Sequence, residues 1–132
     1  MSAPSFRCVC DPAALRGAPG SWAREMLRDG EIALLAGDGG FQEINDVAHS
    51  LGLVSVPVIR TEDSAERQEQ TVIAYAQALP LVWIAGAFSD SASTWARDRG
   101  PMTLLVQTDE PLSDGERRRI DRFVAALYRQ SE

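Results

Sequence analysis

Short apolar runs alternate with segments of helical spacing along the whole chain, and this alternation constrains the fold more than any other feature. Each run has the length of a buried strand, and between the runs apolar residues recur at the spacing of one helix face. Such alternation is typical of α/β domains in which helices cover both sides of a mainly parallel sheet. We therefore expect one three-layer α/β domain over residues 1–132, with a sheet of about five strands.

The expected strands are the apolar runs Phe6–Cys10, Glu31–Ala36, Val54–Ile59, Leu81–Ala85 and Met102–Gln107. The expected helices are Ser21–Arg28, Phe41–Leu51, Glu66–Ala78, Ser91–Arg97 and a last one from Ser113 to about Arg129. Gly52 stands where a left-handed helix cap is favoured, and Ser113 with Glu116 forms a capping box. The chain shows no internal repeat or linker, so we expect a single folded unit.

The charged residues exclude several functions. All 13 basic residues are arginine, against 19 acidic residues, so the formal net charge is −6 and no lysine is present for a phosphate loop, a Schiff base or a general base. Net acidity disfavours binding to nucleic-acid phosphates or anionic lipid. Arg117, Arg118, Arg119 and Arg122 lie close together, but acidic residues interleave with them, which favours a solvated helix face. We expect neither a nucleic-acid nor a membrane partner.

Cys8 and Cys10 lie two residues apart in the first expected strand, and no second pair completes a zinc site or a disulfide framework. We interpret them as buried thiols rather than as a redox pair, which indicates a reducing compartment. No charged start precedes an apolar run at the N-terminus, and no apolar window is long enough to cross a bilayer. The expected location is therefore the cytoplasm.

The segment Ile32–Ile44 carries the most chemical information. An apolar strand runs into Gly37-Asp38-Gly39-Gly40 and then into a helix, so the loop is expected at the carboxyl end of a parallel strand, where open α/β sheets bind ligands. Glycines let the backbone approach an anion, and the first amides of the helix favour phosphate oxygens. Asp38 is then suited to hold Mg²⁺ beside a diphosphate. Alternatively, the loop is only a tight connection in which Asp38 caps the helix.

The run Gly37-Asp38-Gly39-Gly40-Phe41-Gln42 resembles the diphosphate-binding domain of thiamine diphosphate dependent enzymes, such as acetolactate synthase and the phosphonopyruvate and sulfopyruvate decarboxylases. The strand at Leu53–Ile59, the helix at Val72–Ala76 and the run Gly100–Val106 are similar to later parts of that domain. The resemblance covers roughly residues 20–109, and only the glycine loop is specific in itself. It implies a thiamine diphosphate-binding-like fold.

The resemblance also implies a set of site residues. Asp38 would ligate Mg²⁺, and the amides of the glycine loop would meet the cofactor diphosphate. The family closes its metal site with an Asn after the next strand, where this chain has Arg60-Thr61-Glu62-Asp63, so Thr61 or Glu62 is expected to supply the missing oxygen. The cofactor-binding residues that follow are Gly37, Gly39, Gly40 and Phe41.

In this family the cofactor lies between two domains, and the Glu that activates it comes from the other one, for which 132 residues leave no room. The resemblance therefore implies the smaller subunit of a split thiamine diphosphate dependent 2-oxoacid decarboxylase or carboligase. Its partner would be a pyrimidine-binding subunit or a further copy of the chain. Catalytic residues stay unassigned.

Two other functions remain open. One is a non-catalytic interaction or regulatory protein with a degenerate cofactor site. The other is a metal-dependent nuclease in which Asp11, Asp38 and Asp63 meet at strand ends. His49 is the only histidine, so an imidazole pair cannot hold a metal, and a helix-surface position is expected for it.

The three tryptophans indicate the core and a candidate partner surface. Trp83 lies in an apolar run and is expected in the core. Trp22 and Trp95 are expected either at packed edges or as anchors for a partner.

Overall fold

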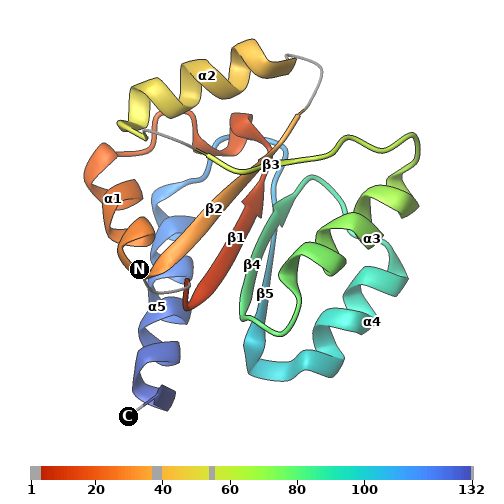
Figure 1. Cartoon of the computed structure of the whole chain (residues 1–132). Coiled ribbons are helices and arrows are strands. Elements are labelled where there is room, and N and C mark those ends of the chain that lie inside the picture. The colour runs from red at the N-terminus through yellow and green to blue at the C-terminus, as the bar shows by residue number, and fades with distance from the viewer. Residues whose placement is uncertain (1–3, 37–39, 54–55, 132) are drawn as a thin grey trace.

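The chain forms a three-layer α/β domain with one parallel sheet (Figure 1), described here by a computed structural model for residues 4–36, 40–53 and 56–131. The strands are β1 (Phe6–Cys10), β2 (Gly30–Leu35), β3 (Val58–Ile59), β4 (Leu81–Ala85) and β5 (Thr103–Gln107). Their order in the sheet is β3-β2-β1-β4-β5, and each neighbouring pair is parallel. The expected fold class, a three-layer domain with five parallel strands, is confirmed.

Helices cover both faces of the sheet. They are α1 (Gly20–Asp29), α2 (Gly40–Leu51), α3 (Ala65–Ala76), α4 (Asp90–Arg99) and α5 (Asp114–Ser131). We call the side covered by α1, α2 and α5 the α1 face, and the side covered by α3 and α4 the α3 face. Two short 3-10 turns, η1 (Pro12–Leu15) and η2 (Gly100–Met102), were not predicted. Within the described part of the chain, every helix is too short or too polar to cross a lipid bilayer.

The path of the chain defines where loops meet. From β1 the chain moves outward through β2 to β3, then crosses to β4 on the other side of β1 and ends the sheet with β5. All strands run in the same direction, so every loop that follows a strand leaves from one edge of the sheet, the carboxyl edge. In doubly wound sheets ligands bind at this edge.

Alternating side chains of β1 supply two separate cores. Cys8 and Cys10 point into the core of the α1 face, whereas Val9 points into the core of the α3 face. Both cysteines are fully buried free thiols, as expected. A hydrogen bond with Cys8, together with burial, raises the pKa of the Cys10 thiol well above its usual value.

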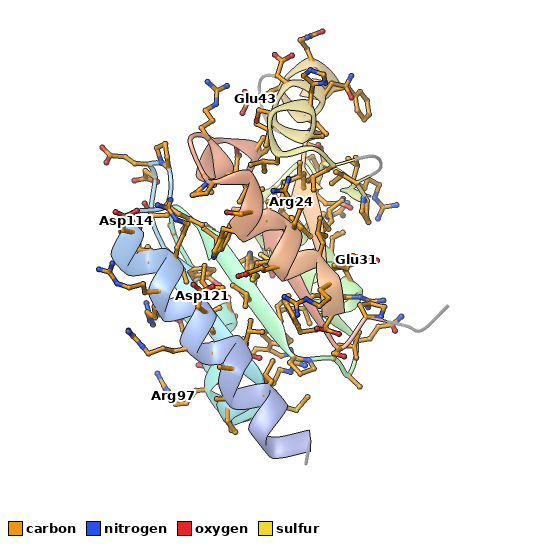
Figure 2. The ribbon with its side chains drawn as sticks, turned by 90° about the vertical axis from the view of Figure 1, so that its left-hand side faces the viewer. Arg24, Glu31, Glu43, Arg97, Asp114 and Asp121 are labelled. Atoms are coloured by element: carbon orange, nitrogen blue, oxygen red, sulfur yellow. The ribbon has the colours of Figure 1, made fainter. Side chains whose placement is uncertain are left out.

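The tryptophans pack within the chain. Trp83 is buried, as expected, and its ring meets Phe88 and Trp95 edge-on at centroid distances of 5.2 and 6.2 Å. Trp22 is only 7% exposed, and its Nε1 donates to Asp121 Oδ1 at 2.9 Å, which joins α1 to α5 (Figure 2). Trp22 and Trp95 are therefore packed edges in this chain.

Helix ends follow their local signals. The predicted capping box is present, since Ser113 N–H donates to Glu116 Oε1 at 2.9 Å and Glu116 N–H donates to Ser113 Oγ at 3.1 Å. Gly52 has a φ of +73° after α2, as the left-handed cap requires. Ser64 and Ser89 cap the N-termini of α3 and α4, because their side chains accept from the N–H groups of Arg67 and Ala92. The sequence analysis did not single them out.

The third strand is shorter than predicted. The expected strand Val54–Ile59 is reduced to Val58–Ile59 among the described residues, while residues 54 and 55 lie outside them. Pro57 has no N–H to donate, and only its carbonyl joins the sheet, accepting from Leu34 N–H at 3.0 Å. Helix α3 ends two residues early, because Gln77 adopts a φ of +51°.

Candidate functional site

The predicted ligand loop joins β2, which ends at the carboxyl edge of the sheet, to α2. Gly37, Asp38 and Gly39 are outside the described residues, so the site is described through the groups on either side of them. Ala36 follows β2 directly, and α2 begins at Gly40. The predicted order of strand, loop and helix is confirmed on both sides of the loop.

Gly40 and Phe41 open helix α2 at this edge. Gly40 has a φ of +61°, which glycine adopts without strain, and a Cβ added there would meet no atom within 4 Å. The Phe41 side chain is 68% exposed, an unusual value for a large apolar side chain. In the same first turn Glu43 pairs with Arg16 at 3.5 Å, so it already has a cationic partner (Figure 2).

Thr61, which follows the next strand, contacts the residue that precedes the ligand loop. Because β3 pairs in parallel with the end of β2, the residues that follow Ile59 leave at the same edge as Ala36. The Thr61 Oγ1 hydroxyl donates to the Ala36 carbonyl at 2.8 Å. The structure thus brings a predicted metal-site residue to the residue that precedes Gly37, across 25 positions of sequence.

The Glu62 carboxylate already has hydrogen-bond partners within the chain. Its Oε1 accepts from Arg60 Nε at 2.7 Å and from Thr71 Oγ1 at 3.0 Å. The hydrogen bond from Arg60, supported by that from Thr71, lowers the pKa of the Glu62 carboxyl, so this group is ionised at neutral pH. One carboxylate oxygen is therefore committed to contacts within the chain.

Helix α3 holds the segment around Glu62 in place, which the sequence did not predict. Gln68 Oε1 accepts from Glu62 N–H at 3.0 Å, and Gln68 Nε2 donates to the Arg60 carbonyl at 3.0 Å. The Arg60 side chain remains 79% exposed. Its guanidinium pairs with Glu62, so the two side chains together add no net charge to this edge.

The described donors fit Mg²⁺ unequally. Hydroxyl and carboxylate oxygens are the ligand types that Mg²⁺ takes in proteins. Thr61 uses its proton on Ala36, which leaves the lone pairs of its oxygen available. Glu62 shares Oε1 with two donors, so a metal there would compete with Arg60. Thr61 fits the predicted metal position better than Glu62.

The acids proposed for a nuclease have separate tasks. Asp11 Oδ1 accepts from Ala13 N–H at 3.1 Å and caps the turn after β1, and Asp63 lies 3.9 Å from Arg67 on α3. Across residues 4–36, 40–53 and 56–131, no group of three or more His, Cys, Asp or Glu side chains is arranged to hold a metal. His49 is exposed on α2, as expected.

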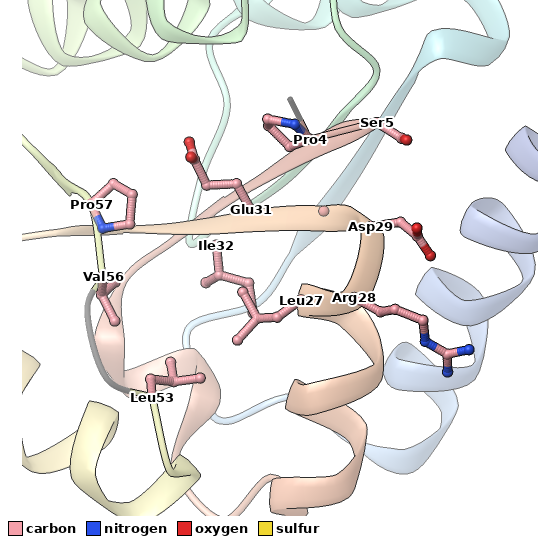
Figure 3. Close-up of a pocket in the computed structure, with 11 residues that line it drawn as sticks. Pro4, Ser5, Leu27, Arg28, Asp29, Glu31, Ile32, Leu53, Val56 and Pro57 are labelled. Carbon is pink, nitrogen blue, oxygen red and sulfur yellow. The ribbon is translucent and has the colours of Figure 1, made fainter. Parts of the chain in front are cut away.

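A separate cavity of about 280 Å³ lies at the opposite, amino end of β2 (Figure 3). Leu27, Ile32, Leu53 and Val56 converge on it, whereas Glu31 projects to the other side of the strand. It lies at the wrong edge of the sheet to belong to the glycine loop.

Comparison with protein-family models, with curated proteins and with solved structures finds no match to this chain.

Proposed function

We propose that the chain binds the diphosphate group of a cofactor together with Mg²⁺ at the carboxyl edge of β2 and β3. Following the sequence resemblance, the cofactor is thiamine diphosphate. The chain then acts in the cytoplasm as the smaller subunit of a split 2-oxoacid decarboxylase or carboligase, with a pyrimidine-binding subunit or a further copy as partner. Diphosphate binding is the first claim, and the identity of the cofactor is a second claim that depends on it.

One contact carries the proposal. The hydrogen bond from Thr61 to the Ala36 carbonyl brings the expected metal-site segment after β3 beside the residue that precedes the glycine loop. Parallel pairing of β2 with β3 makes this proximity a property of the fold. The start of α2 at Gly40 adds a helix N-terminus, whose amides and dipole favour phosphate oxygens.

Each residue would have a distinct task. Thr61 and Asp38 would offer oxygens to the metal, and the glycine amides would meet the phosphates. Thiamine diphosphate, when bound, supplies carbanion stabilisation, and the protein supplies placement and electrostatics.

Isothermal titration of the full chain tests the proposal. The chain is titrated with thiamine diphosphate plus Mg²⁺, and separately with inorganic diphosphate plus Mg²⁺. We expect heat with both, and loss of most of it when Mg²⁺ is omitted. Absence of binding with every diphosphate refutes the site. Heat with inorganic diphosphate alone keeps the site and rejects thiamine diphosphate.

Two variants locate the binding. Asp38→Ala is expected to lose binding altogether, and Thr61→Val to weaken it about tenfold, because one oxygen ligand or hydrogen bond near a charge is worth about 1.5 kcal/mol. Thr94→Val, the same change on an exposed residue of α4, is the matched control and should bind normally. Equal losses in Thr61→Val and Thr94→Val would place the binding elsewhere.

The second candidate is a non-catalytic interaction protein, and the exposed Phe41 favours it. A phenylalanine that is 68% exposed beside the loop suits contact with another protein. If the titrations show no heat, this candidate replaces the first.

A further inference from the structure

The two outer strands of the sheet differ in how well they are protected against pairing. An outer strand presents unpaired N–H and C=O groups, and proteins protect such edges by short strands, proline or charge. Strand β3 has all three protections, because it is two residues long and lies between Pro57 and Arg60. This edge is therefore poorly suited to accept a further strand.

Strand β5 has none of these protections within its own length, and the nearest proline and charge, Pro101 and Asp109, each lie two residues beyond its ends. It runs for five residues, Thr103–Gln107, without a charge or a proline. It pairs with β4 over its whole length, and among the described residues no strand lies on its other side. The other edge of the sheet thus offers an uncharged strand of ordinary length.

Burial along the sheet supports the same conclusion. Residues Leu81–Ile84 of the neighbouring β4 are buried, at 3% exposure or less. Leu104 and Leu105 of β5 also pack against the two cores, one on each face, yet both remain only partly buried. Helices α4 and α5 cover the faces of β5, and among the described residues no further strand pairs with its edge.

The sequence of β5 is matched to itself in an antiparallel arrangement. A two-fold axis through Leu105 places Leu105 opposite its own copy, Leu104 opposite Val106, and Thr103 opposite Gln107. Every directly opposed pair then joins apolar with apolar or polar with polar side chains, and no like charges meet. Pairing with an unrelated strand would not require that the side chains of β5 match their own order when it is reversed, so this match favours a second copy of the chain.

Charge at the ends of β5 fits the same arrangement. Asp109 and Glu110 follow the strand, whereas the last turn of α4, which the short turn η2 joins to β5, holds Arg97 and Arg99 beside Asp98 and so carries a net positive charge. Antiparallel pairing brings the end of one β5 beside the beginning of the other. The acidic pair of each copy therefore lies toward the basic helix end of its partner.

We propose that β5 pairs with β5 of a second copy of this chain, in a two-fold interface that joins both five-stranded sheets into one. The interface lies at the β5 edge, away from the ligand loop next to β3. It stands independently of the proposed cofactor role.

Sedimentation equilibrium of the full chain tests the proposal. We expect a dimer that dissociates on dilution. Gln107 is exposed, and Gln107→Lys places a charge at each of two symmetric positions, so we expect about tenfold weaker dimerisation. Val58→Lys puts the same charge on the exposed residue of β3 and should leave dimerisation unchanged.

Cysteine cross-linking tests the register. Thr103→Cys and Gln107→Cys chains should form disulfide-linked dimers when mixed, and neither should do so alone, because only the mixed pair lies opposed. The native cysteines are fully buried and do not interfere. A chain that is monomeric at all concentrations overturns the proposal, and so does a dimer that responds equally to both lysine variants or gives no mixed cross-link.

Discussion

The two faces of the sheet differ in the size of the side chains that their helices pack against it. On the α1 face the helices bring large aliphatic side chains to the sheet, among them Met26, Ile44 and Ile120. On the α3 face the fully buried helix residues are smaller, Val72, Ala76 and Ala92. Aromatic rings from β4 and from the helices, together with arginine stems, fill the rest of the space on that face.

On the α3 face two arginines stack on aromatic rings. Arg7 lies over the Tyr75 ring at 4.6 Å and donates to the Tyr75 carbonyl. Arg99 lies over the Trp95 ring at 4.7 Å and donates to the Leu79 carbonyl. Burial lowers the pKa of the Arg99 guanidinium. Small helix residues thus leave room for long amphipathic side chains, whose charges are met by carbonyls and ring faces.

Side-chain volume is therefore distributed differently on the two faces of the sheet. Several medium-sized side chains fill the α1 face. When one of them is truncated, its neighbours can therefore move into part of the cavity. Trp83 holds a large part of the α3 face by itself, since it contacts both Phe88 and Trp95.

The largest predicted effect comes from removing Trp83. We expect Trp83→Ala to lower the free energy of unfolding by about 3–5 kcal/mol, and Ile44→Ala on the α1 face by about 2 kcal/mol. Urea titration followed by circular dichroism measures both. Trp83→Phe retains a ring and should cost less than Trp83→Ala. Equal losses for Trp83→Ala and Ile44→Ala would contradict the proposed difference between the faces.

Alkaline pH should weaken the α3 face through Tyr75. Burial, together with the hydrogen bond to Glu31, raises the pKa of Tyr75 above its usual value of 10.0. The folded chain then keeps a proton that the unfolded chain releases, so this contribution to stability is complete below pH 10 and is lost as pH rises further. The expected slope is at most about 1.4 kcal/mol per pH unit.

Tyr75→Phe isolates this effect. Denaturant titrations at several pH values above 9 should show a shallower decline for the variant than for the native chain. Part of the decline should persist, because the raised pKa of Cys10 acts in the same direction above its usual 9.0. Identical slopes would show that Tyr75 does not govern the alkaline behaviour.

The smallest predicted effect is on the α1 face, at the contact between α1 and α5. Asp121→Ala removes the acceptor of Trp22 Nε1 and should cost about 1 kcal/mol. Asp121→Asn keeps an oxygen at the same position and should cost less. Thermal unfolding of the two variants measures the difference. If both are equally destabilised, charge rather than the hydrogen bond stabilises the contact.

Prediction from sequence succeeded where the signal was local. The capping box at Ser113 and the left-handed Gly52 follow from neighbouring residues alone, and both are present. The strand over residues 54–59 was overextended, because its apolar run did not reveal that Pro57 enters the sheet only through its carbonyl. For the candidate site, the loop and Thr61 could be named in advance, but their contact could not.

The residues around Thr61 show why its contacts could not be predicted from the sequence. Gln68 and Thr71 hold the Arg60–Glu62 segment from one face of α3, and no motif marks them, since their spacing is that of any helix face. Contacts of this kind depend on how α3 lies against the sheet.

The alternation of strands and helices, the helix caps and the glycine loop after a buried strand can all be read from the order of the residues, because periodicity and capping depend on neighbouring residues. The strand order, the face that each helix covers, the contact of Thr61 with Ala36 and the outer position of β5 become visible only in the folded chain. These features arise from contacts between residues distant in sequence, and their geometry is set by how the layers pack.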